Sequence, residues 1–207
     1  MKTITKLPAQ PCLANARAHG WNWDEFHNND QAGYLECVAQ GLLEQNDECA
    51  YTGLWLGEGT KQKIHIDHFR KKGIYPLLTF VWDNLFVAAK EVPCGADFKD
   101  GKVHGPQNYA NSLYASFFSP LDAVLAEKFW YRSDGMMMPA DGLSAPDKDK
   151  VLKTIEMFNL NDGMLKERRK VIIRQIQQLD SLADDEVRAC MQGSGFSFLV
   201  ERELQLR

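Results

Sequence analysis

The sequence lacks paired cysteines. Its five cysteines are an odd number, and no two of them form a Cys-x-x-Cys pair. This scattered spacing excludes a disulfide framework and a complete four-cysteine zinc site. Cys49 and Cys94 each lack a second cysteine at Cys-x-x-Cys spacing, and two thiols cannot complete a tetrahedral zinc site. We therefore expect free thiols in a reducing compartment and no structural zinc. The five residues are Cys12, Cys37, Cys49, Cys94 and Cys190.

The sequence also lacks a long hydrophobic run. No window approaches the roughly 18 consecutive apolar residues that a membrane-spanning helix needs. The N-terminal run MKTITKLPAQPC does not contain the apolar stretch of a signal peptide. We therefore expect no membrane partner and a cytoplasmic location.

An excess of positive charge is missing as well. The formal net charge is -4 and the pI is about 5.7, which excludes a protein that coats nucleic acid by bulk charge. A local basic cleft remains compatible with these values, because the field at a site depends on nearby residues. With 207 residues, of which 44% are hydrophobic, the chain can bury a substantial core as one domain, with or without helical additions.

Apolar spacing and turn residues predict an α+β fold. Helices are expected over residues 31–45, 121–130, 148–158, 161–182 and 184–191, with a short one over 96–102. Strand-forming residues dominate 49–55, 63–69 and 79–87. Residues 1–30 are predicted to be an irregular arm that packs through its aromatic rings, and 103–120 and 133–147 are predicted to be loops.

The stretch 64–102 carries most of the chemistry. Hydrolysis of a phosphodiester needs an activated water and a cation that stabilises the phosphoryl charge, and an Asp beside a His can supply both functions. Asp67 and His68 can share a centre only where the strand ends or distorts, because neighbouring strand residues point to opposite faces. His65, in contrast, is expected to be a hydrogen-bonded histidine of the core.

Several cations surround this pair in an otherwise acidic chain. Their number could create a local patch that attracts phosphate groups; the alternative is an ordinary charged hairpin surface. The candidate substrate-binding residues are Arg70, Lys71, Lys72, Lys99 and Lys102.

Three runs of this stretch carry a resemblance: DHFRKK at 67–72, WDNL at 82–85 and CGADFKDGK at 94–102. Together they resemble the core of HNH endonucleases, the ββα-metal fold. More narrowly, they are similar to the PtuB-type nucleases of Septu and retron anti-phage systems, with the signature His-Phe-Arg-Pro-Lys, Trp-x-Asn-Leu and Cys-Asn-x-x-Lys-Gly. The resemblance spans about residues 45–175. It implies an HNH core at 49–105, an N-terminal arm and helix at 1–48, and a helical, partner-docking region at 106–207.

The resemblance also implies roles for single residues. By position, His68 matches the general base, Asp67 the acid that binds a divalent metal (Mg²⁺ or Mn²⁺), and Asn84 the residue that braces the catalytic loop. The last metal ligand of the family has no identical match. Asp97 is the nearest candidate, and Asp100 or Asp83 are alternatives. Many relatives carry two Cys-x-x-Cys pairs, which this chain does not have.

The function expected from the resemblance is a metal-dependent endonuclease that acts on DNA or structured RNA. It would serve as the effector of an anti-phage system, together with a PtuA-like ATPase and a retron reverse transcriptase with its msDNA product. A second hypothesis is a degenerate HNH scaffold that binds nucleic acid or a partner without cutting. A third is a zinc-binding adaptor.

Overall fold

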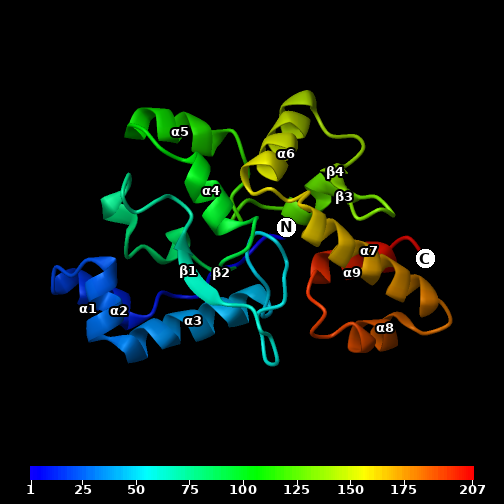
Figure 1. Ribbon diagram of the computed structural model, residues 1–207, viewed down its shortest axis with the longest axis horizontal. Coiled ribbons are helices and arrows are strands. Elements are labelled where there is room, and N and C mark those ends of the chain that lie inside the picture. Colours follow the sequence, from blue (N-terminus) through cyan, green and yellow to red (C-terminus); the bar gives the residue numbers. More distant parts are fainter.

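A computed structural model describes residues 1–207, which form a mixed α+β fold (Figure 1). The α-helices are α1 (Pro11–Ala18), α2 (Trp23–Asn29), α3 (Gln31–Gln45), α4 (Ala96–Lys102), α5 (Gln107–Ala115), α6 (Ala145–Met157), α7 (Gly163–Gln178), α8 (Asp184–Cys190) and α9 (Ser197–Leu204). The strands are β1 (Ile64–His68), β2 (Leu85–Ala89), β3 (Phe129–Tyr131) and β4 (Met137–Pro139). Short 3₁₀ turns cover Pro76–Leu78, Trp82–Asn84 and Leu125–Lys128.

The centre of the molecule is an antiparallel pair of strands followed by a helix. β1 pairs with β2 in a register that sets Ile66 opposite Val87 and His68 opposite Leu85, and α4 follows β2 along the chain. Every residue of β2 is buried, as expected for a strand that is covered on both faces. The sequence predicted β1 within 63–69 and α4 over 96–102. It predicted the second strand over 79–87, of which only 85–87 belong to β2, because Trp82–Asn84 form a 3₁₀ turn.

The long helix α3 covers the outer edge of β2. An αL residue, Asn46, ends α3, and the buried Gln45 side chain donates to Val87 O at 2.8 Å and accepts from Val87 N at 2.9 Å. This amide satisfies backbone groups that a strand edge would otherwise leave without partners. Gly41 lets the two elements approach, since a Cβ there would lie 2.5 Å from Val87 Cγ2.

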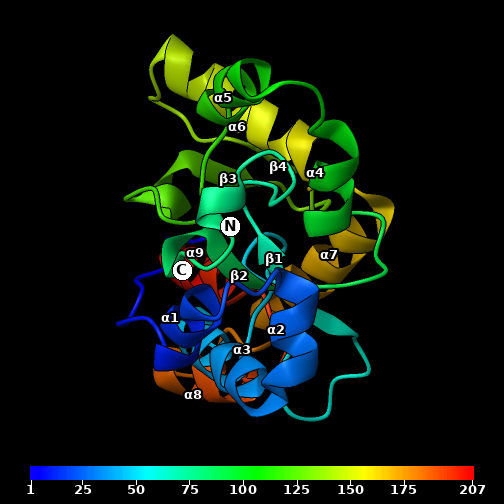
Figure 2. The same cartoon turned by 90° about the vertical axis from the view of Figure 1, so that its left-hand side faces the viewer.

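Two hydrophobic clusters hold these elements together. The larger one joins the strand pair to α5, α6, α7 and α9, and the smaller one packs α1, α2 and α3 against Ile66, Phe80, Trp82 and Leu85. Figure 1 shows α1–α3 at one end and α7–α9 at the other, with the strand pair between them. Figure 2, which looks from the α1–α3 side, shows these helices in front of β1 and β2. The central hairpin is therefore covered from both ends of the chain.

Several predicted elements were wrong. Residues 1–30 are irregular only in part: 1–10 contain no helix or strand, but α1 follows them, and a capping box of Asn22 and Glu25 starts α2. Residues 49–55 form no strand; only Glu48 and Trp55 make an isolated bridge. Residues 107–115 are the helix α5 rather than a loop, and 121–130 are not a helix, since a left-handed Val124 leads into a 3₁₀ turn and β3. The region 106–207 thus contains the β3–β4 hairpin besides its helices.

None of the helices has both the length and the apolar character needed to cross a membrane.

The C-terminal segment is fixed to the centre by a close backbone approach at Gly195. This residue has φ +76°, and a Cβ on it would lie 2.7 Å from Gly53 O and 2.8 Å from Trp55 N.

Gly142 has the same φ of +76°, but nothing lies within 4 Å of its Cβ position. We expect Gly142→Ala to lower the free energy of unfolding by about 1 kcal/mol through the left-handed conformation alone. Gly195→Ala should lose a further ~1–3 kcal/mol from the clash.

Urea unfolding of the two variants measures this difference directly, because both introduce the same methyl group at the same φ. Equal losses in the two variants would contradict the close approach at Gly195.

Candidate functional site

A cleft of about 480 Å³ opens beside β1 and the first turns of α4. It brings together five residues predicted for the site: Asp67, His68, Lys71, Lys72 and Asp97. Trp23, Tyr34, His65, Ile66, Gly73, Lys90 and Asp100 complete its walls. Residues as far apart in the sequence as Trp23 and Asp100 therefore share one concave surface, as expected of a binding or catalytic site.

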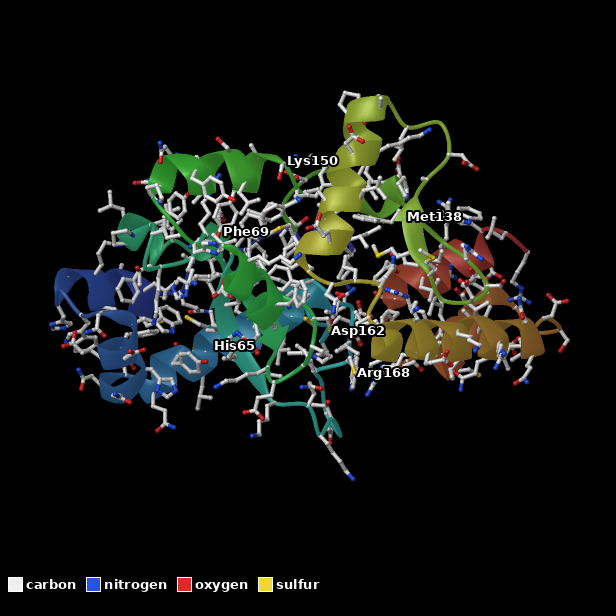
Figure 3. All side chains as sticks on the ribbon, turned by 45° about the horizontal axis from the view of Figure 1, so that its top comes forward. His65, Phe69, Met138, Lys150, Asp162 and Arg168 are labelled. Atoms are coloured by element: carbon white, nitrogen blue, oxygen red, sulfur yellow. The ribbon has the colours of Figure 1, made fainter.

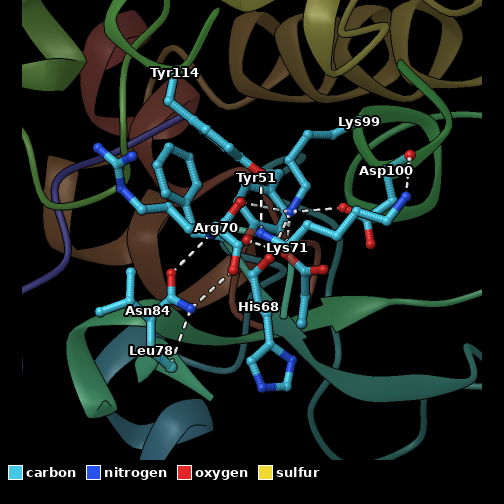
Figure 4. Close-up of polar contacts among 11 residues, drawn as sticks. Tyr51, His68, Arg70, Lys71, Leu78, Asn84, Lys99, Asp100 and Tyr114 are labelled. Carbon is cyan, nitrogen blue, oxygen red and sulfur yellow. Dashed lines mark hydrogen bonds and ion pairs between the residues drawn. The ribbon is translucent and has the colours of Figure 1, made fainter. Parts of the chain in front are cut away.

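A buried ion pair forms the floor of this region (Figure 4). The Lys99 ammonium is fully buried and donates to Asp67 Oδ2 at 2.8 Å, His68 O at 2.9 Å and Phe69 O at 3.0 Å. Asp100 Oδ1 lies 3.2 Å from the same nitrogen. Tyr51 donates a short hydrogen bond to Asp67 Oδ2. Both hydrogen bonds of the carboxylate thus go to Oδ2, and Oδ1 makes none.

The pKa values of Asp67, Lys99 and Asp100 are shifted by burial and by the charges of their neighbours. Burial alone would raise the pKa of Asp67, but the Lys99 ammonium and the hydrogen bonds from Lys99 and Tyr51 outweigh it, so the pKa is lowered. Burial opposes the charge of Lys99, yet Asp67 and Asp100 raise its pKa. Burial raises the pKa of Asp100, and the Asp67 carboxylate adds to this shift although Lys99 opposes it. The stable arrangement is an ionised Asp67–Lys99 pair.

His68 is the last residue of β1, and its ring turns away from the Lys99 ammonium (Figure 4). His68 Nε2 donates to Thr79 O at 3.0 Å, and the Trp23 ring packs edge-on at 4.5 Å between centroids. Because a carbonyl only accepts, Nε2 carries the hydrogen, and Nδ1 is the basic nitrogen of the neutral ring. Burial lowers the pKa of His68 to about 4, against the opposing effects of Thr79 O and Asp67. The imidazole is therefore neutral at pH 7.

Asn84 connects the backbone of Arg70, two residues after His68, to that of Leu78. Its Oδ1 accepts from Arg70 N at 2.7 Å, and its Nδ2 donates to Arg70 O at 3.0 Å and Leu78 O at 3.2 Å. Leu78 precedes Thr79, the hydrogen-bond acceptor of His68. The Asn84 side chain is buried, and all hydrogen bonds of its amide go to backbone groups. It could therefore contribute to chemistry only indirectly, by holding the backbone near His68 in place.

The five cations predicted to bind substrate are in different environments. Lys71 and Lys72 line the cleft, although Lys71 also donates to Asp100 O at 2.9 Å and Lys72 pairs with Asp24 at 3.3 Å. Lys99 is fully buried, so its prediction as a substrate contact is wrong: its protons stabilise the fold.

Two other predicted cations do not line the cleft. Arg70 lies over the rings of Tyr75 and Tyr114, and Lys102 pairs with Glu156. Lys90, which was not among the predicted site residues, does line the cleft. It follows β2 directly, so its position depends on the register of the hairpin.

His65 was expected to be a satisfied core histidine, and this expectation is wrong. It lies on β1, two residues before Asp67 and therefore on the same face of the strand, and it lines the cleft. Its Nδ1 is buried and has no hydrogen-bond partner. Figure 3 shows His65 on the central hairpin, whereas Arg168 lies on α7. The alternation of strand residues was the signal that could have selected His65 together with Asp67.

The donors of the cleft fit a hard divalent cation. Such an ion binds through one or two carboxylates and keeps several waters. Asp67 Oδ1 makes no hydrogen bond, Asp97 uses only Oδ2, to accept from Glu91 N at 3.0 Å, and His65 Nδ1 lacks a partner. No three or more His, Cys, Asp or Glu side chains are gathered closely enough to hold a metal ion by themselves. A cation bound at Asp67 or Asp97 would therefore keep most of its water ligands.

No protein-family model matches this chain, and no curated protein matches it significantly. The HNH resemblance therefore depends on sequence motifs, chiefly the three runs at 67–72, 82–85 and 94–102, and more loosely on residues 154–169.

Replacement of the buried lysine provides a test of the ion pair. Lys99→Met removes the ammonium and leaves a buried, charged Asp67, which we expect to lower the free energy of unfolding by about 3–5 kcal/mol. The double variant Lys99→Met/Asp67→Asn contains neither charge and should recover part of that loss. Urea unfolding of the two single variants and the double variant gives the coupling energy. A coupling energy close to zero would refute the pair.

The pH dependence of stability provides a test of the His68 environment. The pKa is lowered from 6.5 to about 4 on folding, so the unfolded chain binds a proton that the folded chain does not bind between these values. The free energy of unfolding should fall as the pH drops from about 6.5 towards 4, by about 3 kcal/mol at most. His68→Gln should remove this part of the pH dependence, whereas the exposed His104→Gln should keep it.

NMR titration of the His68 ring protons measures the pKa itself. A midpoint near 6.5 in the folded protein would contradict the buried environment.

Proposed function

We propose that this chain is a metal-dependent endonuclease of the HNH kind, with β1, β2 and α4 as its ββα core. The observation that supports this proposal most is the composition of one cleft. It combines a neutral histidine, a carboxylate with a free oxygen and several lysines. Hydrolysis of a phosphodiester needs a base for water, stabilisation of the phosphoryl charge and attraction of an anionic substrate, and these residue types supply all three.

His68 would act as the general base. Its Nε2 is held by Thr79 O, so Nδ1 is the nitrogen that takes a proton from the attacking water. Asn84 would act as a positioning residue, because it fixes Leu78 O and the backbone of Arg70 around this histidine. The sequence analysis predicted this bracing role for Asn84 beside His68, and we keep it in the proposal.

Asp67 and Asp97 would hold the divalent cation, Mg²⁺ or Mn²⁺, with His65 beside them. When bound, the cation supplies charge stabilisation on the phosphoryl group and on the departing oxygen. Lys72 and Lys90 reach the cleft from two different segments and would attract the phosphates that flank the scissile bond. Lys71 spans part of this wall while it also binds the end of α4.

The partners follow from the resemblance alone. Under this proposal, the chain would act in an anti-phage system with a PtuA-like ATPase, and with a retron reverse transcriptase and its msDNA. Its net charge of -4 agrees with an enzyme that captures its substrate with the help of a partner rather than by its own charge.

One observation favours a second function, a scaffold that binds without cutting. Asp67 Oδ2 is already occupied by Lys99 and Tyr51, so a cation would share this carboxylate with a buried ammonium. The positive charge of Lys99 would weaken metal binding at Asp67 by simple repulsion. A degenerate HNH scaffold would keep the same cleft and still contact nucleic acid.

The decisive experiment compares cleavage and binding in matched variants. The purified chain is incubated with plasmid DNA and with total cellular RNA, in Mg²⁺, in Mn²⁺ and in EDTA, with and without a co-expressed ATPase partner. We expect cleavage of one of the two substrates, lost in EDTA and reduced at least about 100-fold in His68→Ala, since a general base contributes that much. His104→Ala, which changes an exposed histidine, should cut like the native chain.

Asp67→Asn is the variant that tests the metal ligand. Like Asp67→Ala, it removes the counter-ion of the buried Lys99 ammonium and is expected to be destabilised, but it keeps the shape of the side chain and an oxygen that can accept from Lys99. Its thermal midpoint is therefore measured beside its activity, and cleavage is assayed below that midpoint. Full cleavage by Asp67→Asn would refute its role as a ligand. Binding without cleavage, with the partner complex intact, would favour the scaffold.

A further inference from the structure

A second hollow lies beside the cleft. It has a volume of about 430 Å³ and shares Trp23, Lys72 and Gly73 with the cleft. Thr79 also lines it, and the carbonyl of Thr79 accepts the hydrogen bond from His68 Nε2. The wall between the two spaces is therefore formed by His68 and its nearest contacts. The two spaces therefore lie next to each other at His68.

Three aromatic rings line the second hollow. They belong to Trp21, Trp23 and Phe80, and Pro76 also lines it. The rings are held in place: Trp23 packs on Phe80 at 5.8 Å between centroids, and His19 stacks on Trp21 at 4.6 Å and 17°. Trp21 is only half-buried. The hollow therefore offers rigid flat surfaces to a flat ligand, at little cost in side-chain entropy.

The charges at the junction suit an anionic chain that bears such a ligand. Lys72 belongs to both spaces, and its ammonium lies 3.3 Å from Asp24 Oδ1, with 43% and 84% of the two side chains exposed. An exposed pair of this kind contributes little, so a phosphate can displace Asp24 from Lys72. Arg17, at the edge, donates to Phe80 O at 3.3 Å.

We propose that this hollow, the Trp21 pocket, receives an unpaired nucleobase whose neighbouring phosphate lies at His68. The inference rests on the proposed function, since it takes the cleft as the site of the phosphodiester. Aromatic rings stack on any base through its π face, which gives binding without strict sequence preference. A base inside a duplex cannot enter without being extruded. The substrate would accordingly be single-stranded or locally unpaired nucleic acid.

The test measures binding with cleavage disabled. Full-length His68→Ala is titrated with short single-stranded DNA and RNA oligonucleotides that carry the fluorescent base 2-aminopurine, and with a blunt duplex of the same sequence. We expect quenching of 2-aminopurine in the single strand. Addition of Trp21→Ala should abolish this quenching and weaken single-strand binding by about 5- to 100-fold, while duplex binding stays within twofold. Trp21→Phe should restore most of the affinity.

Trp130 supplies the matched control. It is also a half-buried tryptophan, but it lies on β3, where Arg202 packs on its ring. Trp130→Ala should leave the oligonucleotide affinity within twofold. If Trp21→Ala does not fold, as judged by its thermal midpoint, Trp21→Leu takes its place.

The outcomes separate this inference from the proposed function. Cleavage by the native chain together with Trp21-independent binding would overturn the pocket and leave the nuclease intact. Single-strand binding that needs Trp21, in a chain that never cuts, would support the pocket and overturn the nuclease. An equal loss for duplex and single strand, or no oligonucleotide binding at all, would overturn the pocket.

Discussion

The structure depends on one buried charge. The Lys99 ammonium has no access to solvent, so the protein must surround it with oxygen atoms, and it does so with Asp67, Asp100 and two backbone carbonyls at the end of β1. An uncompensated ammonium in this place would cost several kcal/mol. The requirement fixes α4 against the strand pair, and through Tyr51 it also fixes the segment before β1. The positions of Asp67 and Asp100 in the cleft follow from this arrangement.

The same interaction divides Asp67 between two roles. Its Oδ2 belongs to the fold, whereas Oδ1 is left for the cleft. A metal site built on this residue would therefore be coupled to stability, and the two candidate functions differ mainly in how far the Lys99 charge reduces the affinity of Asp67 for a cation. The His68 side chain does not have such a double role, because it points to the opposite face of β1 from Asp67. Burial lowers its pKa, so its imidazole is neutral without a charged partner.

The N-terminal helices are part of the site rather than an accessory arm. α2 carries Trp23, which packs against the His68 ring, and the smaller hydrophobic cluster continues from α1–α3 under β1. These helices also form one wall of the Trp21 pocket. The packing of the His68 ring thus depends on Trp23, about 45 positions earlier in the chain. For this reason, the central motif by itself does not describe the site.

The sequence by itself determined the elements whose signal is local. The apolar spacing of α3, α6 and α7, the strand β1 and the short helix α4 were all predictable, and so was the adjacency of Asp67 and His68. Tertiary structure decided the rest. Residues 129–131 form a strand only because 137–139 pair with them, and such non-local pairing leaves no local period. Lys99 looked like a surface cation, and only its packing under a carboxylate 32 positions away made it a structural one. Local pattern can specify which residues are apolar, but which polar groups share a buried volume depends on the folded chain.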